Sequence, residues 1–203
     1  MIYFISRLTY GIILKLFFSL KVQDRENIPK KGPFILVGNH VSNADPVVMA
    51  VACRTMRLRF LAKRELFDRP FMGAWCRACG CIPIERYSGS SAPLKKSLNA
   101  LKNGKALGVF PEGTRSRDGK LQKAQPGVGI IAAKSRVPII PVYISGTDKA
   151  LPIGGKFPRP HPIKVKVGKA LDINGARSIA NRRKSYESIG ERIMEAIGRL
   201  KHE

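Results

Sequence analysis

The stretch from residue 34 to residue 54 reads FILVGNHVSNADPVVMAVACR. Residues 34–37 form a short apolar run that includes β-branched side chains, which predicts a buried strand. Asp45 followed by Pro46 is typical of a helix start, because Asp is a favoured N-cap and Pro is favoured at the first helical position. Residues 46–54 then predict a helix. A strand, a polar loop and a helix in succession indicate one unit of an α/β fold.

The same alternation continues along the chain. Further strands are expected at 58–62, 81–84, 106–110, 139–144 and 163–167, and further helices at 69–78, 92–102, 127–134 and about 178–201. The last helix carries an apolar stripe at helical spacing, formed by Tyr186, Ile189, Ile193, Ile197 and Leu200. Residues 152–162 hold four prolines and two glycines, which predicts a loop. We therefore predict a single α/β domain over 23–203, with a central mixed sheet flanked by helices.

Composition indicates an ordinary globular chain with an unusual charge. The 203 residues are 44% hydrophobic and 25% charged, which excludes a disordered or collagen-like protein. Thirty-seven Lys and Arg residues against 14 Asp and Glu give a formal net charge of +23. An excess of this size indicates anionic partners, which include nucleic acid, a membrane surface and a phosphate-bearing substrate.

Residues 1–22 are far more apolar than the rest and predict a helix that precedes the domain. On a helical wheel Arg7, Lys15 and Lys21 share one side, and the apolar residues Ile2, Ile13, Leu16 and Leu20 lie opposite. This pattern favours a helix that lies in a membrane interface rather than one that crosses it. The alternatives are packing against the domain's own core and a secretory signal, although no small-residue cleavage site follows the segment.

The four cysteines predict no metal site. Cys76, Cys79 and Cys81 are clustered, but Cys53 is the only further cysteine and no histidine pair lies nearby in the sequence. They are expected to act as small apolar residues of a reduced intracellular protein.

The loop that follows the first predicted domain strand carries the strongest candidate for chemistry. His40 and Asp45 lie one turn apart, at the strand end where α/β folds place their ligands. Asp45 accepting a hydrogen bond from Nδ1–H would leave Nε2 of His40 as a general base. The alternatives are a structural histidine, a simple helix cap at Asp45, and ordinary turn formers at Asn39 and Ser42.

Three other strand ends carry basic groups. Residues 110–116 read FPEGTRS, where Gly113 permits close backbone approach and Arg115 offers a guanidinium suited to phosphate. Arg86 closes the segment 80–86, and Lys63 closes the strand predicted at 58–62. On its own, the 110–116 segment could instead be a turn with a solvated Arg115.

In their order and spacing these segments resemble the four motif blocks of the glycerolipid acyltransferases, most of all bacterial 1-acylglycerol-3-phosphate acyltransferases. The likeness runs from about residue 26 to residue 171. It rests on Asn39-His40 with Asp45, on 80–86, on 110–116 and on 137–142.

The resemblance implies acyl transfer from a thioester to the sn-2 hydroxyl of 1-acyl-sn-glycerol 3-phosphate, which gives phosphatidic acid. His40 would be the general base and Asp45 would orient it, with no covalent enzyme intermediate. Ser42 lies close enough in sequence to be considered as a nucleophile, and an amide near Val41 or Ser42 is a candidate to stabilise the oxyanion. No cofactor or metal is implied, because acyl-CoA or acyl-carrier protein serves as co-substrate.

By the same resemblance, the third block would bind the acceptor through Glu112, Gly113, Thr114 and Arg115. The acceptor phosphate is expected to contact basic groups, for which Lys63, Arg86 and Arg115 are the candidates. An anionic membrane surface would be a partner, and the enzyme would lie on the cytoplasmic face of the cell membrane as a peripheral or monotopic protein.

Three alternative functions remain. A related acyltransferase could use glycerol 3-phosphate, another lysophospholipid or an amine-bearing lipid, and a hydrolase could use water as the acceptor. A basic nucleic-acid-binding module is disfavoured, since aromatic residues are 7% of the chain and there is one Trp. Nucleic acid is therefore not an expected partner.

Overall fold

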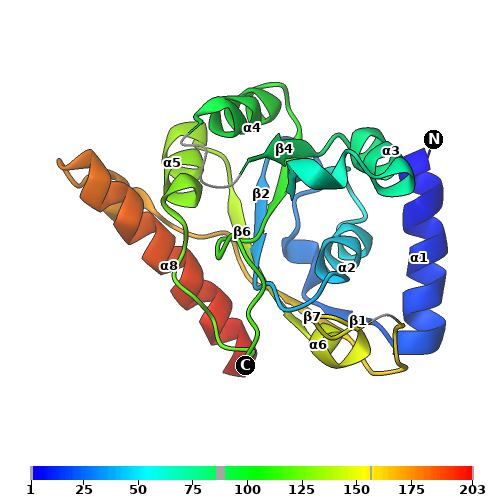
Figure 1. The fold of residues 1–203 in the computed structure, drawn as a ribbon. Coiled ribbons are helices and arrows are strands. Elements are labelled where there is room, and N and C mark those ends of the chain that lie inside the picture. The colour runs from blue at the N-terminus through cyan, green and yellow to red at the C-terminus, as the bar shows by residue number, and fades with distance from the viewer. Residues whose placement is uncertain (1, 86–89, 156, 203) are drawn as a thin grey trace.

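The computed structural model describes residues 2–85, 90–155 and 157–202. In this part of the chain seven strands form one sheet in the order β1-β7-β6-β2-β5-β3-β4 (Figure 1). All neighbouring strands run parallel except β6 and β7, so the predicted mixed sheet is confirmed. The strands are β1 (Lys21–Gln23), β2 (Ile35–Gly38), β3 (Leu58–Lys63), β4 (Ile82–Ile84), β5 (Ala106–Val109), β6 (Ile139–Ser145) and β7 (Lys164–Val167).

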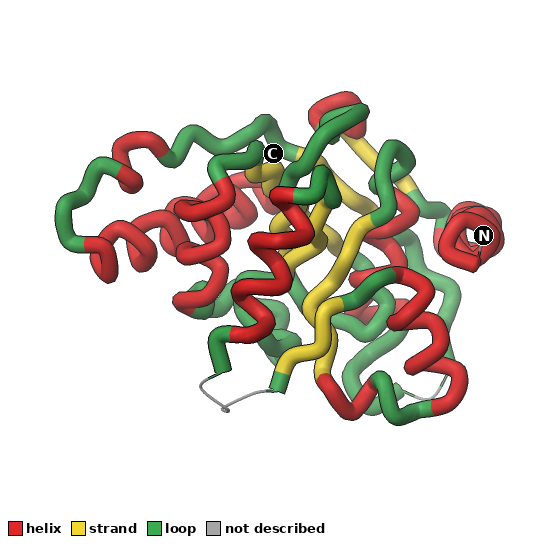
Figure 2. Tube along the Cα trace, turned by 90° about the horizontal axis from the view of Figure 1, so that it is seen from above, coloured by secondary structure: helices red, strands yellow, loops and turns green. Residues whose placement is uncertain are grey.

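Helices cover both faces of the sheet. The layer on one face contains α1, α2 and α3, and the layer on the other contains α4, α5 and α8 (Figures 1 and 2). The helices are α1 (Ile2–Phe18), α2 (Asp45–Ala52), α3 (Pro70–Cys79), α4 (Ala92–Lys102), α5 (Pro126–Ser135), α6 (Thr147–Ala150), α7 (Asn174–Arg177) and α8 (Arg182–His202). Single 3-10 turns lie at Arg25–Asn27 and Arg64–Leu66.

The apolar run at 34–37, before the loop that joins β2 to α2, supplies side chains to two hydrophobic clusters. Phe34 and Leu36 pack with residues of α1 and α2, whereas Ile35 and Val37 pack with residues of α5 and α8. Alternate side chains of a strand point to opposite faces, and both faces of this sheet are covered. This is why the run is apolar throughout rather than alternating with polar residues.

The expected elements are present, with ends shifted by a few residues. The predicted apolar stripe of the last helix is confirmed at Ile189, Ile193, Ile197 and Leu200, which are buried. The described part of 152–162 contains neither helix nor strand, as expected. The sequence analysis missed β1, α6 and α7 because each has only three or four residues, too few to show a periodic pattern.

The first helix ends earlier than the sequence suggested. Ser19 adopts a left-handed φ of 44°, and the N–H of Leu20 donates back to the carbonyl of Leu14. A left-handed residue directly after Phe18 ends the helix, and the bond from Leu20 to Leu14 folds the chain back onto its last turns. Lys21 therefore lies in β1, paired with Lys164 of β7, and does not belong to a basic side of the helix.

Arg7 also differs from its expected role as part of an exposed basic stripe. α1 packs across α2, where Gly11 approaches Val51. From this position Arg7 Nη1 donates to the carbonyl of Arg54 at 2.8 Å and to that of Cys53 at 3.4 Å. A cation near the C-terminal carbonyls of a helix is favourable. Arg7 thus links α1 to the end of α2. Separately, no helix of the described residues is both long and apolar enough to span a membrane.

Candidate active site

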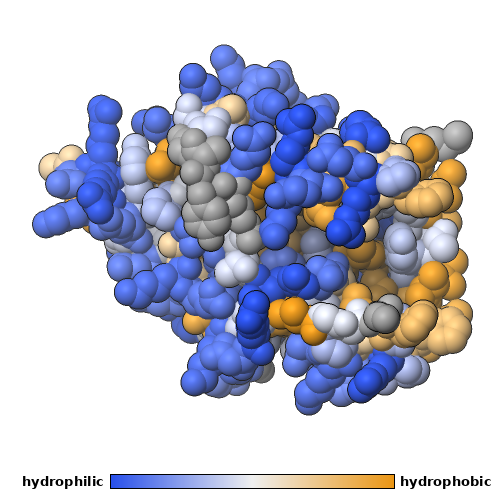
Figure 3. All heavy atoms as spheres, in the orientation of Figure 1, coloured by the Kyte–Doolittle hydropathy of each residue, from blue (hydrophilic) through white to orange (hydrophobic). Residues whose placement is uncertain are grey.

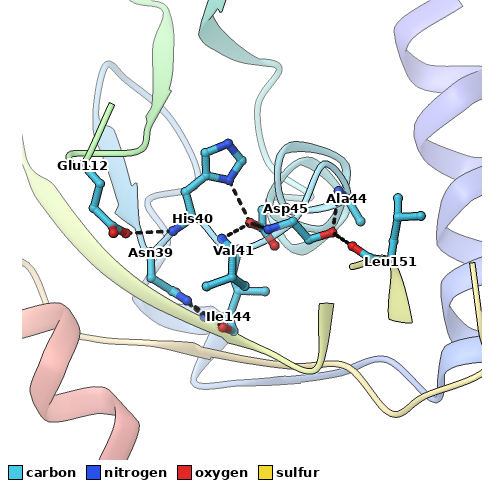
Figure 4. Close-up of polar contacts among 9 residues, drawn as sticks. Asn39, His40, Val41, Ala44, Asp45, Glu112, Ile144 and Leu151 are labelled. Carbon is cyan, nitrogen blue, oxygen red and sulfur yellow. Dashed lines mark hydrogen bonds and ion pairs between the residues drawn. The ribbon is translucent and has the colours of Figure 1, made fainter. Parts of the chain in front are cut away.

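The loop between β2 and α2 is organised around one oxygen of Asp45 (Figure 4). Asp45 Oδ2 accepts hydrogen bonds from the backbone N–H groups of Val41 and Ser42, each at 2.7 Å. The same oxygen lies 2.8 Å from His40 Nδ1. Asp45 is fully buried as the first residue of α2, and its side chain turns back into the loop instead of capping the helix. The structure therefore joins the two residues that the sequence analysis paired.

This geometry favours one tautomer of a neutral imidazole. With Nδ1–H donating to Asp45, the lone pair of His40 is on Nε2. The His40 side chain is 17% exposed, and Nε2 has no hydrogen-bond partner among the described residues. An accessible neutral imidazole with its second nitrogen held by a carboxylate can remove a proton from a bound hydroxyl.

The backbone of His40 is held by the segment that follows β5. The N–H of His40 donates to Glu112 Oε1 at 2.9 Å, and the His40 carbonyl accepts from the N–H of Ser116 at 2.7 Å. Glu112 Oε2 accepts from the N–H of Gln122 at 3.2 Å. Burial raises the pKa of Glu112, and the two backbone donors oppose that rise. Glu112 is 1% exposed, so its carboxylate joins two loops from inside the protein.

Asn39 fixes the other side of the loop. Its Nδ2 donates to the carbonyl of Ile144 at 2.8 Å, and its Oδ1 accepts from the N–H of Ile144 at 2.7 Å. The side-chain amide thereby extends the pairing of β2 with β6, which otherwise ends at Gly38 and Val142. The sequence analysis considered Asn39 an ordinary turn former and missed this role.

An aromatic stack supports the imidazole ring. The rings of His40 and Phe110 are 4.2 Å apart and inclined by 19°, and Phe60 lies against the same Phe110 at 6.1 Å. Gly108 makes room for the stack, since a Cβ there would collide with the Phe60 ring. The sequence analysis assigned Phe110 no role, but a glycine inside a buried strand is a signal of such close approach.

The hydrogen bonds of the loop test two possibilities that the sequence left open. Ser42 Oγ donates to the carbonyl of Leu151 at 2.7 Å and accepts from the N–H of Ala44 at 3.1 Å. Ser42 is buried and its Oγ is engaged by these two backbone groups rather than by the imidazole, so it is not placed as a nucleophile. The N–H groups of Val41 and Ser42 already donate to Asp45 and are not free to bind an oxyanion.

The other predicted site residues lie at the same sheet edge. Gly113 adopts a left-handed φ of 67° in the turn after β5, Thr114 is exposed and Arg115 is half-buried next to Ser116. Lys63 is exposed at the end of β3. Neither Arg115 nor Lys63 has a hydrogen bond or ion pair with a described residue, which leaves both cations available. Arg86 lies outside the described residues.

Among the described residues, no three His, Cys, Asp or Glu side chains converge as a metal site requires. What the sheet edge does offer is a carboxylate-held imidazole with unpaired cations nearby. Such an arrangement can support general-base catalysis.

Comparison with known proteins identifies the family. A sequence model of the family described as Acyltransferase matches residues 19–145, more than half of the chain. The chain therefore belongs to the acyltransferase family, as the motif blocks predicted.

Individual relatives agree with this assignment. The chain is 32% identical over 157 residues to a chloroplastic 1-acyl-sn-glycerol-3-phosphate acyltransferase of Brassica napus, covering 76% of this chain and 45% of that one. It is 30% identical to the 1-acyl-sn-glycerol-3-phosphate acyltransferase of Streptococcus pneumoniae, covering 95% and 72%. The crystal structure of the 1-acyl-sn-glycerophosphate acyltransferase PlsC from Thermotoga maritima superposes with a TM-score of 0.79 at 28% identity, covering 99% and 80%. The chain spans about half the length of the chloroplast relatives.

Proposed function

We propose that the protein transfers an acyl chain from a thioester donor to the sn-2 hydroxyl of 1-acyl-sn-glycerol 3-phosphate, giving phosphatidic acid. The observation that carries this proposal is the His40–Asp45 contact of 2.8 Å, at the strand end that the family's first motif block occupies. Relatives named 1-acyl-sn-glycerol-3-phosphate acyltransferases support the choice of acceptor.

In the proposed reaction His40 acts first as a base and then as an acid. Its Nε2 accepts the proton of the acceptor hydroxyl while the hydroxyl oxygen attacks the thioester carbonyl carbon. Asp45 stabilises the imidazolium that forms. The tetrahedral intermediate collapses, the C–S bond breaks, and the imidazolium gives its proton to the departing thiolate. The products are an ester and a free thiol, and no enzyme nucleophile is required.

The acceptor phosphate is assigned to the cations on the β5–β3 side of the loop. Arg115 follows β5, Lys63 is the last residue of β3, and Arg86 is retained as a third candidate from the sequence. A guanidinium can donate two parallel hydrogen bonds to phosphate. Gly113 and Thr114 are assigned to the backbone turn beside the acceptor.

Glu112 is assigned a positioning role rather than direct contact with the acceptor. Both of its oxygens accept backbone N–H groups, and the side chain is buried. It acts through the backbone of His40.

A membrane surface is the proposed partner of α1. The outer face of this helix is strongly apolar, with Leu8 67% and Leu16 71% exposed. Phe71 of α3 and Phe157 of the 152–162 loop are 92% and 81% exposed, and these segments adjoin the two ends of α1. In Figure 3 hydrophobic side chains gather along the side of the molecule formed by α1. An apolar surface of this extent fits peripheral or monotopic binding on the cytoplasmic face of the cell membrane.

The test is acyl transfer from palmitoyl-CoA and palmitoyl-carrier protein to 1-acyl-sn-glycerol 3-phosphate in vesicles. The His40→Ala variant is expected to lower kcat by about 10²–10⁴-fold. The matched control is His202→Ala, which removes an exposed histidine of α8 and is expected to retain activity.

Wild-type turnover in a folded His40→Ala protein would contradict the mechanism. Glycerol 3-phosphate, other lysophospholipids and water are compared as acceptors in the same assay. A higher kcat/KM with one of these acceptors than with 1-acyl-sn-glycerol 3-phosphate would show that it is the preferred acceptor instead.

A further inference from the structure

A cavity of about 400 Å³ lies on the β6 side of the catalytic loop. Asn39 and Val41 of that loop line it, together with the end of β6, the start of α6 and the segment that leads into β7. His40, Asp45 and Arg115 do not line it, so it is distinct from the acceptor side described above. Its volume is within the usual range for small-molecule sites.

The polar part of the cavity wall is cationic. Lys149 and Lys164 are exposed, His161 is half-buried beside them, and Asp148 is the one acidic lining residue. Neither lysine has a hydrogen bond or ion pair with any residue that the structure describes. Two ammonium groups without anionic partners favour a ligand that carries phosphate groups.

The rest of the wall suits a ring system. Tyr143 and Pro162 lie beside the lysines, with Ile144 and Val41 deeper in the protein. Burial and the nearby Asp148 raise the pKa of Tyr143, which keeps the phenol neutral next to an anion. The turn between β6 and α6 is held close to this wall, because Gly146 has a φ of 87° and a side chain there would collide with the Pro162 carbonyl.

The strand order separates this cavity from the acceptor cations. β6 and β7 lie on one side of β2, and β5 and β3 lie on the other. The catalytic loop extends from β2, so His40 is between a cationic region at Lys149 and Lys164 and another at Arg115 and Lys63. Two phosphate-bearing substrates could use such an arrangement, with one substrate reaching the base from each side.

We propose that this cavity binds the phosphorylated nucleotide of coenzyme A in the acyl donor, with Lys149 and Lys164 contacting its phosphates and Tyr143 its adenine or ribose. This inference rests on the proposed acyltransferase function. It assigns the donor to the β6 side of the loop, from which the flexible pantetheine arm carries the thioester to His40.

The test compares two donors that carry the same acyl chain, one with phosphate groups and one without. The variant is Lys149→Ala/Lys164→Ala, and the matched control is Lys95→Ala/Lys96→Ala, which removes two exposed charges from α4. The cavity variant is expected to raise the KM for palmitoyl-CoA at least about tenfold relative to the KM for the palmitoyl thioester of N-acetylcysteamine, which lacks phosphate. The acceptor KM and the control variant are expected to stay within about twofold of the wild type.

A direct binding measurement separates failure of this site from failure of the proposed function. Adenosine 3′,5′-bisphosphate is titrated into the wild type and the cavity variant by calorimetry, with no transfer required. Binding that is lost in the cavity variant and kept in the α4 control supports the site. Absence of binding to the wild type overturns the proposed site. So does an increase in KM that affects only the acceptor or only a carrier-protein donor, or one that the α4 control shows to the same extent.

Discussion

His40 is held at three different parts of the residue. Asp45 accepts from Nδ1, Phe110 stacks on the ring face, and Glu112 with Ser116 binds the backbone N–H and carbonyl. Only the first of these contacts fixes the tautomer. The other two fix where Nε2 points, and a displacement of about 1 Å can cost two orders of magnitude in rate. We therefore expect the three contacts to be separable by substitution.

Phe110→Leu tests the ring contact. Leucine keeps an apolar side chain but removes the flat surface on which the imidazole lies, so kcat is expected to fall about tenfold with the acceptor KM little changed. Steady-state kinetics and a thermal melt are the measurements. Phe110→Tyr keeps the ring and should restore kcat to within about threefold of the wild type. A kcat loss that tracks the melting temperature in both variants would mean that Phe110 serves stability alone.

Glu112→Gln tests the backbone contact. The amide offers one acceptor oxygen where the carboxylate has two, so either His40 N–H or Gln122 N–H would face an NH₂ group. A buried donor left unpaired costs about 1–3 kcal/mol, which should lower the free energy of unfolding and reduce kcat. Urea unfolding and kinetics measure both effects. An increased acceptor KM with unchanged kcat and stability would instead indicate that Glu112 contacts the substrate.

At the scale of elements, the sequence predicted the helices and strands that carry a periodic apolar pattern. It missed the strand and the hydrogen bond that depend on tertiary contacts. The run at 34–37 and the stripe on α8 were recognisable because burial imposes a period on apolar residues. β1 was not recognisable in the sequence, because Lys21 and Gln23 belong to a strand only through their pairing with β7. The His40–Asp45 pair was predictable from its local spacing. The bond from Asn39 to Ile144 joins residues 105 apart in sequence, and no local pattern signals it.

α1 provides a test of the membrane surface. Leu8→Gln/Leu16→Gln removes two exposed leucines and leaves the packed residues Tyr3, Leu14 and Phe18 intact. Burial of a leucine contributes about 1.5–3 kcal/mol, so vesicle binding should weaken at least about tenfold with no change in melting temperature. Vesicle co-sedimentation and a thermal melt are the measurements. Leu14→Gln is the matched control, and it should lower the melting temperature. Unchanged vesicle binding in the double variant would rule out this face of α1.

α3 provides a test of the cysteine interpretation. Burial, with the neighbouring Cys76, raises the pKa of Cys79 and of Cys81 to about 12. At pH 8 only about one molecule in ten thousand carries either thiolate, and the thiolate is the reactive form. Maleimide labelling of the folded protein should therefore be slow at both positions and rapid in urea. Mass spectrometry locates the label, and labelling at the rate of free cysteine in the folded state would contradict burial.

At the scale of the whole molecule, the net charge of +23 has to be reconciled with an apolar binding face. The β2–α2 loop lies between two groups of cations that have no ionic partner among the described residues, and α1 with its neighbours presents an apolar surface. The proposed membrane partner would satisfy both, because a bilayer interior would receive the apolar side chains and anionic headgroups would attract the basic residues around them. The two contributions differ in their response to salt.

Salt dependence separates these contributions. The screening length falls from about 10 Å at 0.1 M to about 3 Å at 1 M, while burial of apolar surface is little affected. Binding to anionic vesicles should therefore weaken at least about tenfold over this range, since basic residues near such a surface contribute about 1 kcal/mol each. Binding to neutral vesicles should change less than about twofold. Co-sedimentation with both vesicle types is the measurement, and the α1 double variant should bind both more weakly. Equal salt sensitivity on the two vesicle types would show that the charge does not act at the membrane, and would leave soluble anionic substrates as its partners.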